Sequence, residues 1–172
     1  MSQPTILIAG IGNIFLGDDA FGCEVVRELS RRPWPENVRA VDFGIRGFDL
    51  AYTILDGNDV TIFVDATPRG EAPGTLYTIE PDVSELETLD ADAVIETHGM
   101  NPLKVLRMVK AMGGEFNKIL LLGCEPETFG PEEGKIGLSP VVQAAVPEAI
   151  RIVESLVQQH LSEPVELKRE YN

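Results

Sequence analysis

A glycine-rich turn between an apolar run and two consecutive acids is the feature that most constrains the fold of this chain. The aliphatic run at 6–9 is short and bounded by glycine, which is typical of a strand buried on both faces of a sheet. Gly10 and Gly12 allow backbone angles and close contacts that a Cβ would exclude. Asp18 stands where a helix N-cap is expected, because apolar residues recur every four positions after it. Asp19 should therefore lie at the carboxyl edge of a sheet, where open α/β folds bind ligands.

Two nucleotide-binding motifs do not fit this turn. The dinucleotide fingerprint needs a third glycine where the chain has Phe15, whose bulk would block close packing of helix on strand. A phosphate-binding loop needs Lys and Ser/Thr after its second glycine, but Gly17 is followed by Asp18 and Asp19. Two carboxylates would repel a triphosphate unless a cation were already bound. The turn is thus suited to a cation, a water molecule or a peptide.

Composition limits the class of protein further. The 172 residues predict one domain, 1–172, with residues 162–172 as a tail that frays. The net charge of −14 and the pI near 4.4 argue against a nucleic-acid partner. No apolar run reaches the roughly 18–20 residues of a membrane helix, and no basic region precedes the first apolar run. We therefore expect a cytoplasmic monomer without a signal peptide or membrane insertion.

Cys23 and Cys124 are too few and too far apart for a zinc or disulfide framework, and we expect both to be small buried apolar groups.

Strands and helices alternate along the chain. The final helical region starts at Ser139 and contains Pro147, which either kinks it or begins a second helix. Hydrophobic patterning predicts strands at 6–9, 38–43, 59–65, 75–79 and 118–123, and helices after Asp18, at 47–55, at 102–112 with Asn101 as its cap, and from 139 onward. This order predicts a three-layer α/β/α sandwich with a mostly parallel, twisted sheet of about five strands, in which 75–79 is an antiparallel edge strand.

Three separated residues form the candidate site. Asp19 follows the first strand, Asp65 ends the third, and His98 precedes a helix. Two carboxylates and one imidazole suit a borderline divalent ion such as nickel or zinc, with coordination positions left open. Each residue also has an ordinary interpretation, since Asp65 could cap a turn and His98 could be a loop histidine. Asp18 is mainly expected to cap a helix, and Asp42 either forms a turn or lines the site.

The same residues resemble a known family. The segments GIGNIFLGDDAFG, VDAT, THGMNP and LLGCEPETF…GLSP, in this order, are similar to those of the hydrogenase maturation endopeptidases. The resemblance implies removal of a C-terminal extension from the large-subunit precursor of nickel–iron (NiFe) hydrogenase, after nickel insertion. It also implies that Asp19, Asp65 and His98 bind a metal. The first-loop acid is Asp19 where some members have Glu, and the segment 43–47 departs from the Gly-Gly-Thr type often found there.

Together these observations give a functional hypothesis. The nickel carried by the immature subunit would serve as a recognition element at Asp19, Asp65 and His98, and zinc or cadmium could occupy the same site in vitro. The nickel could also polarise the scissile carbonyl or acidify a bound water, and the sequence leaves these roles open. Two alternatives are a receiver-like signalling domain that binds magnesium and a non-catalytic α/β binding module. A receiver would need neither a histidine ligand nor the long interval between Ala9 and the acidic pair.

Overall fold

The computed structural model describes residues 3–83, 86 and 100–163. In this part of the chain one mixed sheet has the strand order β2-β1-β3-β5-β4. The strands are β1 (Ile6–Ile11), β2 (Val38–Gly44), β3 (Val60–Ala66), β4 (Leu76–Ile79) and β5 (Lys118–Cys124). The helices are α1 (Phe21–Ser30), α2 (Gly47–Leu55), α3 (Pro102–Ala111) and α4 (Pro140–Leu161), and a 3₁₀ turn, η1 (Gly17–Ala20), precedes α1.

The sheet is parallel except at one edge. β1 pairs in parallel with β2 and β3, and β3 pairs in parallel with β5. β4 pairs antiparallel with β5, as predicted for the strand near 75–79. In the parallel register Gly10 faces Val64, so the residues after β1 lie beside Asp65 near the end of β3. The carboxyl ends of β1, β2 and β3 therefore meet at one edge.

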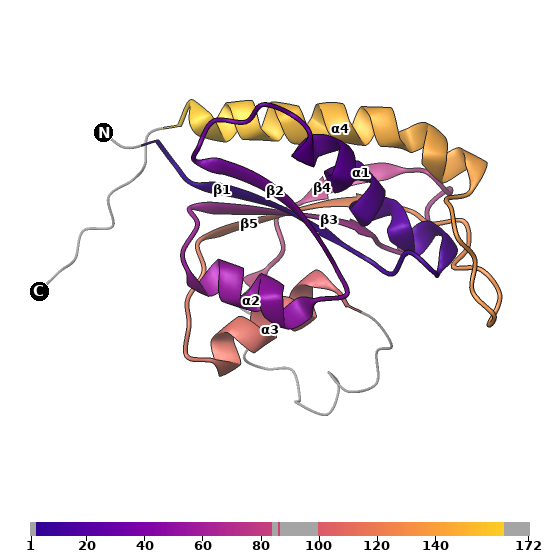
Figure 1. Ribbon diagram of the computed structural model, residues 1–172, viewed down its shortest axis with the longest axis horizontal. Helices are drawn as coiled ribbons and strands as arrows, with labels where there is room; N and C mark the ends of the chain where they lie inside the picture. The colour runs from indigo at the N-terminus through magenta and orange to yellow at the C-terminus, as the bar shows by residue number, and fades with distance from the viewer. Residues whose placement is uncertain (1–2, 84–85, 87–99, 164–172) are drawn as a thin grey trace, which may run out of the picture.

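Helices cover both faces of the sheet, which confirms the predicted three-layer arrangement. Figure 1 shows α1 and α4 on one face and α2 and α3 on the other. Alternate residues of the central strands supply the two apolar cores, because successive side chains of a strand point to opposite faces. Ile8 and Ile62 belong to the core under α1 and α4, whereas Ala9 and Phe63 belong to the core under α2 and α3.

Several local predictions are confirmed. The Asn101 side chain caps α3 by accepting a hydrogen bond from the Lys104 backbone N–H at 2.9 Å. Cys23 and Cys124 are free and fully buried. α4 continues through Pro147 as one helix of 22 residues, and this proline is exposed to solvent. Of the two alternatives for Pro147, a second helix is thus excluded.

Other predictions fall outside the described residues. His98 lies in the segment 87–99, most of the acidic stretch 80–96 lies there or at 84–85, and most of the tail 162–172 lies beyond residue 163. Among the helices that the structure describes, none is long and apolar enough to cross a bilayer.

Candidate active site

Close backbone packing brings the first loop against the end of the sheet. Gly12 has a φ of +150°, and a Cβ added there would overlap the backbone carbonyl oxygen of Asp19. A Cβ added at Gly22 would overlap the backbone oxygen of Val64 in β3. The two glycines thus let the acidic loop approach the ends of β1 and β3 more closely than any side chain would permit.

Asp19 is held in place by its own loop. The Asn13 backbone N–H donates a hydrogen bond of 2.8 Å to Asp19 Oδ2, and the Asp19 residue is only partly exposed. Burial raises the pKa of Asp19 above its ordinary value, although the hydrogen bond from Asn13 acts in the opposite direction. One carboxylate oxygen is therefore fixed by the protein.

Asp65 is the buried member of the pair. It is 4% exposed, and its Oδ1 has no hydrogen-bond partner among the residues that the structure describes. Burial raises the pKa of Asp65 well above its ordinary value, and the negative charge of Asp19 raises it further against a weaker opposing effect of the Ala66 N–H. A buried carboxylate oxygen without a partner is costly, and such groups in native proteins commonly have a functional explanation.

These two carboxylates suit a cation. Their charges repel each other, and a divalent ion between them would remove the repulsion and satisfy Asp65 Oδ1. Within the described ranges no group of three or more His, Cys, Asp or Glu side chains is placed to hold a metal. The structure thus brings together Asp19 and Asp65 of the predicted set, whereas the third predicted ligand, His98, lies outside the description.

Asp18 does not cap α1, contrary to the prediction. The N-cap position of α1 is Ala20, which makes no side-chain cap hydrogen bond. Instead, the fully buried Asp18 carboxylate accepts hydrogen bonds from the backbone N–H groups of Glu127 (2.8 Å) and Thr128 (3.1 Å). It also accepts two from Ser139, one from the N–H (2.7 Å) and one from the hydroxyl (2.9 Å). The Asp18 carboxylate therefore finds its hydrogen-bond donors in a loop far away in the sequence, and not at the start of the adjacent helix.

These hydrogen bonds determine the ionisation of Asp18. Burial by itself raises its pKa, but the hydrogen bonds from Ser139, Glu127 and Thr128 outweigh burial and leave the pKa below its ordinary value. Asp18 and Asp19 are neighbours in sequence, yet their pKa values shift in opposite directions. Asp18 is consequently a structural anion, whereas the carboxylate of Asp19 is disfavoured by its own burial.

Backbone hydrogen bonds reinforce the same junction. The Gly17 N–H donates to the Lys135 carbonyl (2.9 Å), and the Lys135 N–H donates to the Phe15 carbonyl (2.7 Å). The Asp18 N–H donates to the Thr128 carbonyl at 3.0 Å. The loop before α1 and the loop before α4 thus form one hydrogen-bonded unit beside the carboxylate pair.

Glu125 fixes the turn that follows Asp65. The residue is 6% exposed, and its carboxylate accepts hydrogen bonds from the N–H groups of Arg69 (2.7 Å) and Gly70 (3.2 Å). The hydroxyl of Tyr77, on β4, donates to the Thr67 carbonyl in the same turn. The antiparallel edge strand therefore helps to position the chain leaving β3.

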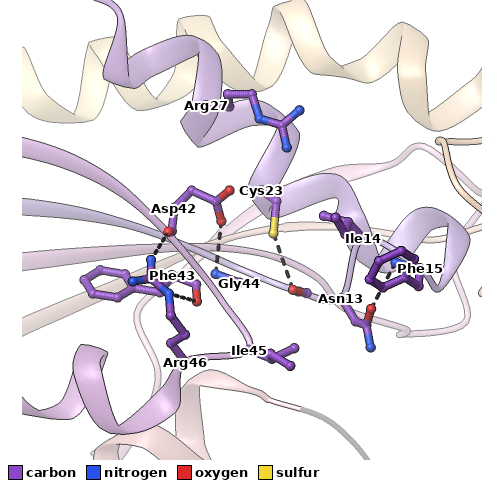
Figure 2. A pocket seen from close by; sticks show the side chains of 11 residues that line it. Asn13, Ile14, Phe15, Cys23, Arg27, Asp42, Phe43, Gly44, Ile45 and Arg46 are labelled. Carbon is purple, nitrogen blue, oxygen red and sulfur yellow. Dashed lines mark hydrogen bonds between the residues drawn. The ribbon is translucent and has the colours of Figure 1, made fainter.

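Asp42 forms a turn, one of its two predicted roles, and also lines a pocket that adjoins the candidate site. Its Oδ1 accepts a hydrogen bond from the Gly44 N–H at 3.0 Å. The pocket has a volume of about 400 Å³ and lies between the ends of β1 and β2 (Figure 2). It is lined by Gly12, Asn13, Ile14, Phe15, Cys23, Arg27, Asp42, Phe43, Gly44, Ile45 and Arg46.

Sequence reasoning missed several of these contributors. Asn13 acts on Asp19 through its backbone N–H, which no side-chain pattern reveals. Ser139 stands at the N-cap of α4, as predicted, but its hydrogen bond to Asp18 spans 121 positions of sequence. Glu125 stood in a segment read as a polar loop. The available signal was an acid at the end of a buried apolar run, as at Asp65.

The fold and the carboxylate pair define a class: an α/β enzyme with an acidic, cation-suited site at the carboxyl edge of a mixed sheet. A model of the hydrogenase maturation protease family matches residues 23–156. The chain belongs to this family.

Individual relatives agree with this assignment. A putative hydrogenase maturation protease of Methanocaldococcus jannaschii is 36% identical over 155 residues, which cover 89% of this chain and 96% of that protein. The hydrogenase 2 maturation protease of Escherichia coli is 30% identical, with 86% and 87% covered. The solved structure of the hydrogenase maturating endopeptidase HybD from E. coli superposes with a TM-score of 0.71 at 29% identity, covering 90% of this chain and 93% of that one. The chain is thus an enzyme of the protease class, and the receiver-like alternative is set aside.

Proposed function

We propose that this protein removes the C-terminal extension from the large-subunit precursor of a nickel–iron hydrogenase after nickel has been inserted. The observation that carries the proposal is the unpartnered Oδ1 of Asp65 beside the charge of Asp19. Family membership supports the choice of a hydrogenase precursor as substrate.

The proposed role of the carboxylate pair is to recognise the nickel that the precursor carries. Asp19 and Asp65 would supply oxygen ligands, and His98, which the sequence analysis adds, would supply a nitrogen ligand. A metal bound to both proteins would anchor the scissile segment at the sheet edge and lower the entropic cost of positioning it. A precursor without nickel would lack this anchor and would remain uncut.

The test compares nickel-loaded and nickel-free precursor, with mass spectrometry of the product. Wild-type enzyme should shorten the loaded precursor and leave the nickel-free one intact. Asp65→Asn should leave both intact, while Met112→Ser, which alters an exposed side chain at the end of α3, should cleave like the wild type. Equal cleavage of both precursors would refute nickel recognition, and failure to cut either would refute the assigned substrate.

A further inference from the structure

The mouth of the pocket beside the candidate site exposes large apolar side chains from two different loops. Ile14 and Phe15, from the loop after β1, are 40% and 58% exposed, and Ile45, from the turn after β2, is 62% exposed. All three line the same pocket (Figure 2). Scattered exposed apolar residues need no explanation, but a group gathered around a concavity is typical of a binding surface.

The loop after β1 is held in a defined conformation. The Phe15 N–H donates to Asn13 Oδ1 at 2.9 Å, and the Leu16 N–H donates to the Asn13 carbonyl at 3.1 Å. Asn13 is itself fixed by the bond from its N–H to Asp19. Phe15 is therefore presented by a hydrogen-bonded turn.

The turn after β2 is fixed to the same extent. The Gly12 N–H donates to the Gly44 carbonyl at 3.1 Å, and Gly44 has a φ of +56° that favours glycine. The guanidinium of Arg46 donates to the backbone carbonyls of Asp42 (2.7 Å) and Phe43 (3.2 Å). These bonds close the turn and leave Ile45 pointing outward, so the apolar mouth is organised before any ligand binds.

The charges around the pocket favour an apolar occupant over an acidic one. Arg27 and Arg46 both line it, but each already has a carboxylate partner, Glu24 and Asp49 respectively, at 3.5 Å. Asp42 adds a negative charge to the same wall. An acidic side chain would have to displace existing partners, whereas an apolar side chain would cover surface that is now exposed to water.

The pocket adjoins the carboxylate site through two residues of its wall. Asn13 forms part of the pocket wall and donates to Asp19, and Gly12 lies against the Asp19 backbone. An extended peptide advances about 3.3–3.6 Å per residue, so a chain whose scissile bond lies at Asp19 reaches the pocket within a few residues. The volume of about 400 Å³ is in the range of sites that enclose a ligand.

We infer that this pocket is the subsite that receives apolar side chains of the precursor segment next to the scissile bond, with Phe15 and Ile45 as its specificity-determining residues. This inference rests on the function proposed above, because it assigns the occupant to that substrate.

The test measures kcat and KM for nickel-loaded precursor with Ile45→Ser, Phe15→Ser and the conservative Ile45→Leu. Each serine variant should raise KM on the order of tenfold, and the double variant more, while kcat is retained and Ile45→Leu stays near the wild-type value. Met112→Ser is the matched control, since Met112 is exposed and follows α3 at the opposite edge of the sheet.

The outcomes separate the two proposals. If the wild type does not cut the loaded precursor, the proposed function fails and this inference fails with it. If the wild type cuts and the serine variants keep the wild-type KM, the subsite alone is refuted. Sedimentation of the free enzyme tests the remaining alternative, a self-association surface. If the wild type is a dimer, and Ile45→Ser dissociates it while KM is unchanged, the pocket is such a surface and the subsite is refuted.

Discussion

Ser139 donates two hydrogen bonds to the buried carboxylate of Asp18, from its N–H at 2.7 Å and from its hydroxyl at 2.9 Å, across 121 positions of sequence. This contact joins the start of α4 to the loop that carries Asp19. The family resemblance included both segments, but it gave no indication that they touch. Several expected outcomes depend on this contact and on the carboxylate pair beside it.

Replacing Asp18 should destabilise the fold at neutral pH. Asp18→Asn removes the charge that four hydrogen bonds stabilise, and we expect a loss of about 2–3 kcal/mol in the free energy of unfolding. Ser139→Ala removes only the hydroxyl bond and should cost about 1 kcal/mol. Urea denaturation measures both losses. An unchanged free energy of unfolding in Asp18→Asn would contradict the structural role of this anion.

The pH dependence of Asp18 follows from the direction of its pKa shift. Its pKa in the folded protein lies below the ordinary value of 3.8, so its stabilising contribution is present above that value and is lost as pH falls through the folded pKa. Acid titration of unfolding should therefore be less steep in Asp18→Asn below about pH 4. Identical acid profiles of variant and wild type would show that Asp18 does not titrate differently on folding.

Replacing Asp65 should have the opposite effect on metal-free protein. Its pKa is raised in the folded state, so its contribution is most favourable below the ordinary pKa of 3.8 and is lost as pH rises through the folded value. At neutral pH the folded protein therefore bears the cost of a buried, charged carboxylate. Asp65→Asn removes that charge and should raise the free energy of unfolding by about 1–2 kcal/mol, while abolishing cleavage. Asp42→Asn, which changes another aspartate near the carboxyl end of a parallel strand, is the control and should change stability little. A lower melting temperature for Asp65→Asn than for the wild type would contradict the expected cost of burying the Asp65 charge.

Divalent metal binding should depend on the same carboxylates. Calorimetry with nickel, zinc or cadmium should show affinity that falls as pH is lowered, because raised pKa values at Asp19 and Asp65 let protons compete with the metal. Asp19→Asn and His98→Ala should each weaken binding at least tenfold and abolish processing without unfolding the protein. Unchanged affinity in His98→Ala would remove this histidine from the ligand set.

Gly22 gives a test of the close packing behind the site. Glycine in a helix is normally less favourable than alanine by about 1 kcal/mol, so Gly22→Ala would ordinarily stabilise α1. Here the added Cβ meets the Val64 carbonyl, and we expect a loss of about 2 kcal/mol together with reduced cleavage. Gly57→Ala is the control, since it introduces positive-φ strain at a position with no atom within 4 Å and should affect stability alone.

The architecture was predictable because it depends on local periodicity. The five strands, the antiparallel edge strand and the Asn101 cap follow from short-range patterns, and the structure differs from them mainly at the ends of elements. β1 continues to Ile11, because Ile11 pairs with Gly44 after a register shift that no local pattern predicts.

Long-range contacts set the limit of prediction at the site. Asp19 and Asp65 could be proposed from the sequence because the first follows β1 and the second lies at the end of β3, and parallel pairing brings the ends of these strands together. Asp18 has the same local signal as a helix cap, and only the folded chain shows that its partners are Glu127, Thr128 and Ser139. The pocket was missed for a related reason, since Phe15 and Ile45 come from loops whose proximity depends on the order of β1 and β2 in the sheet.

The hydrogen-bonded union of the loops before α1 and α4 also bears on how this protein is made. Residues near position 18 leave the ribosome long before those near position 139, so the acidic loop must wait for most of the chain to be synthesised before its supports exist. An incomplete polypeptide would carry Asp19 and Asp65 without the framework that orients them. Proteolytic competence should thus arise only after the segment that begins α4 has been synthesised.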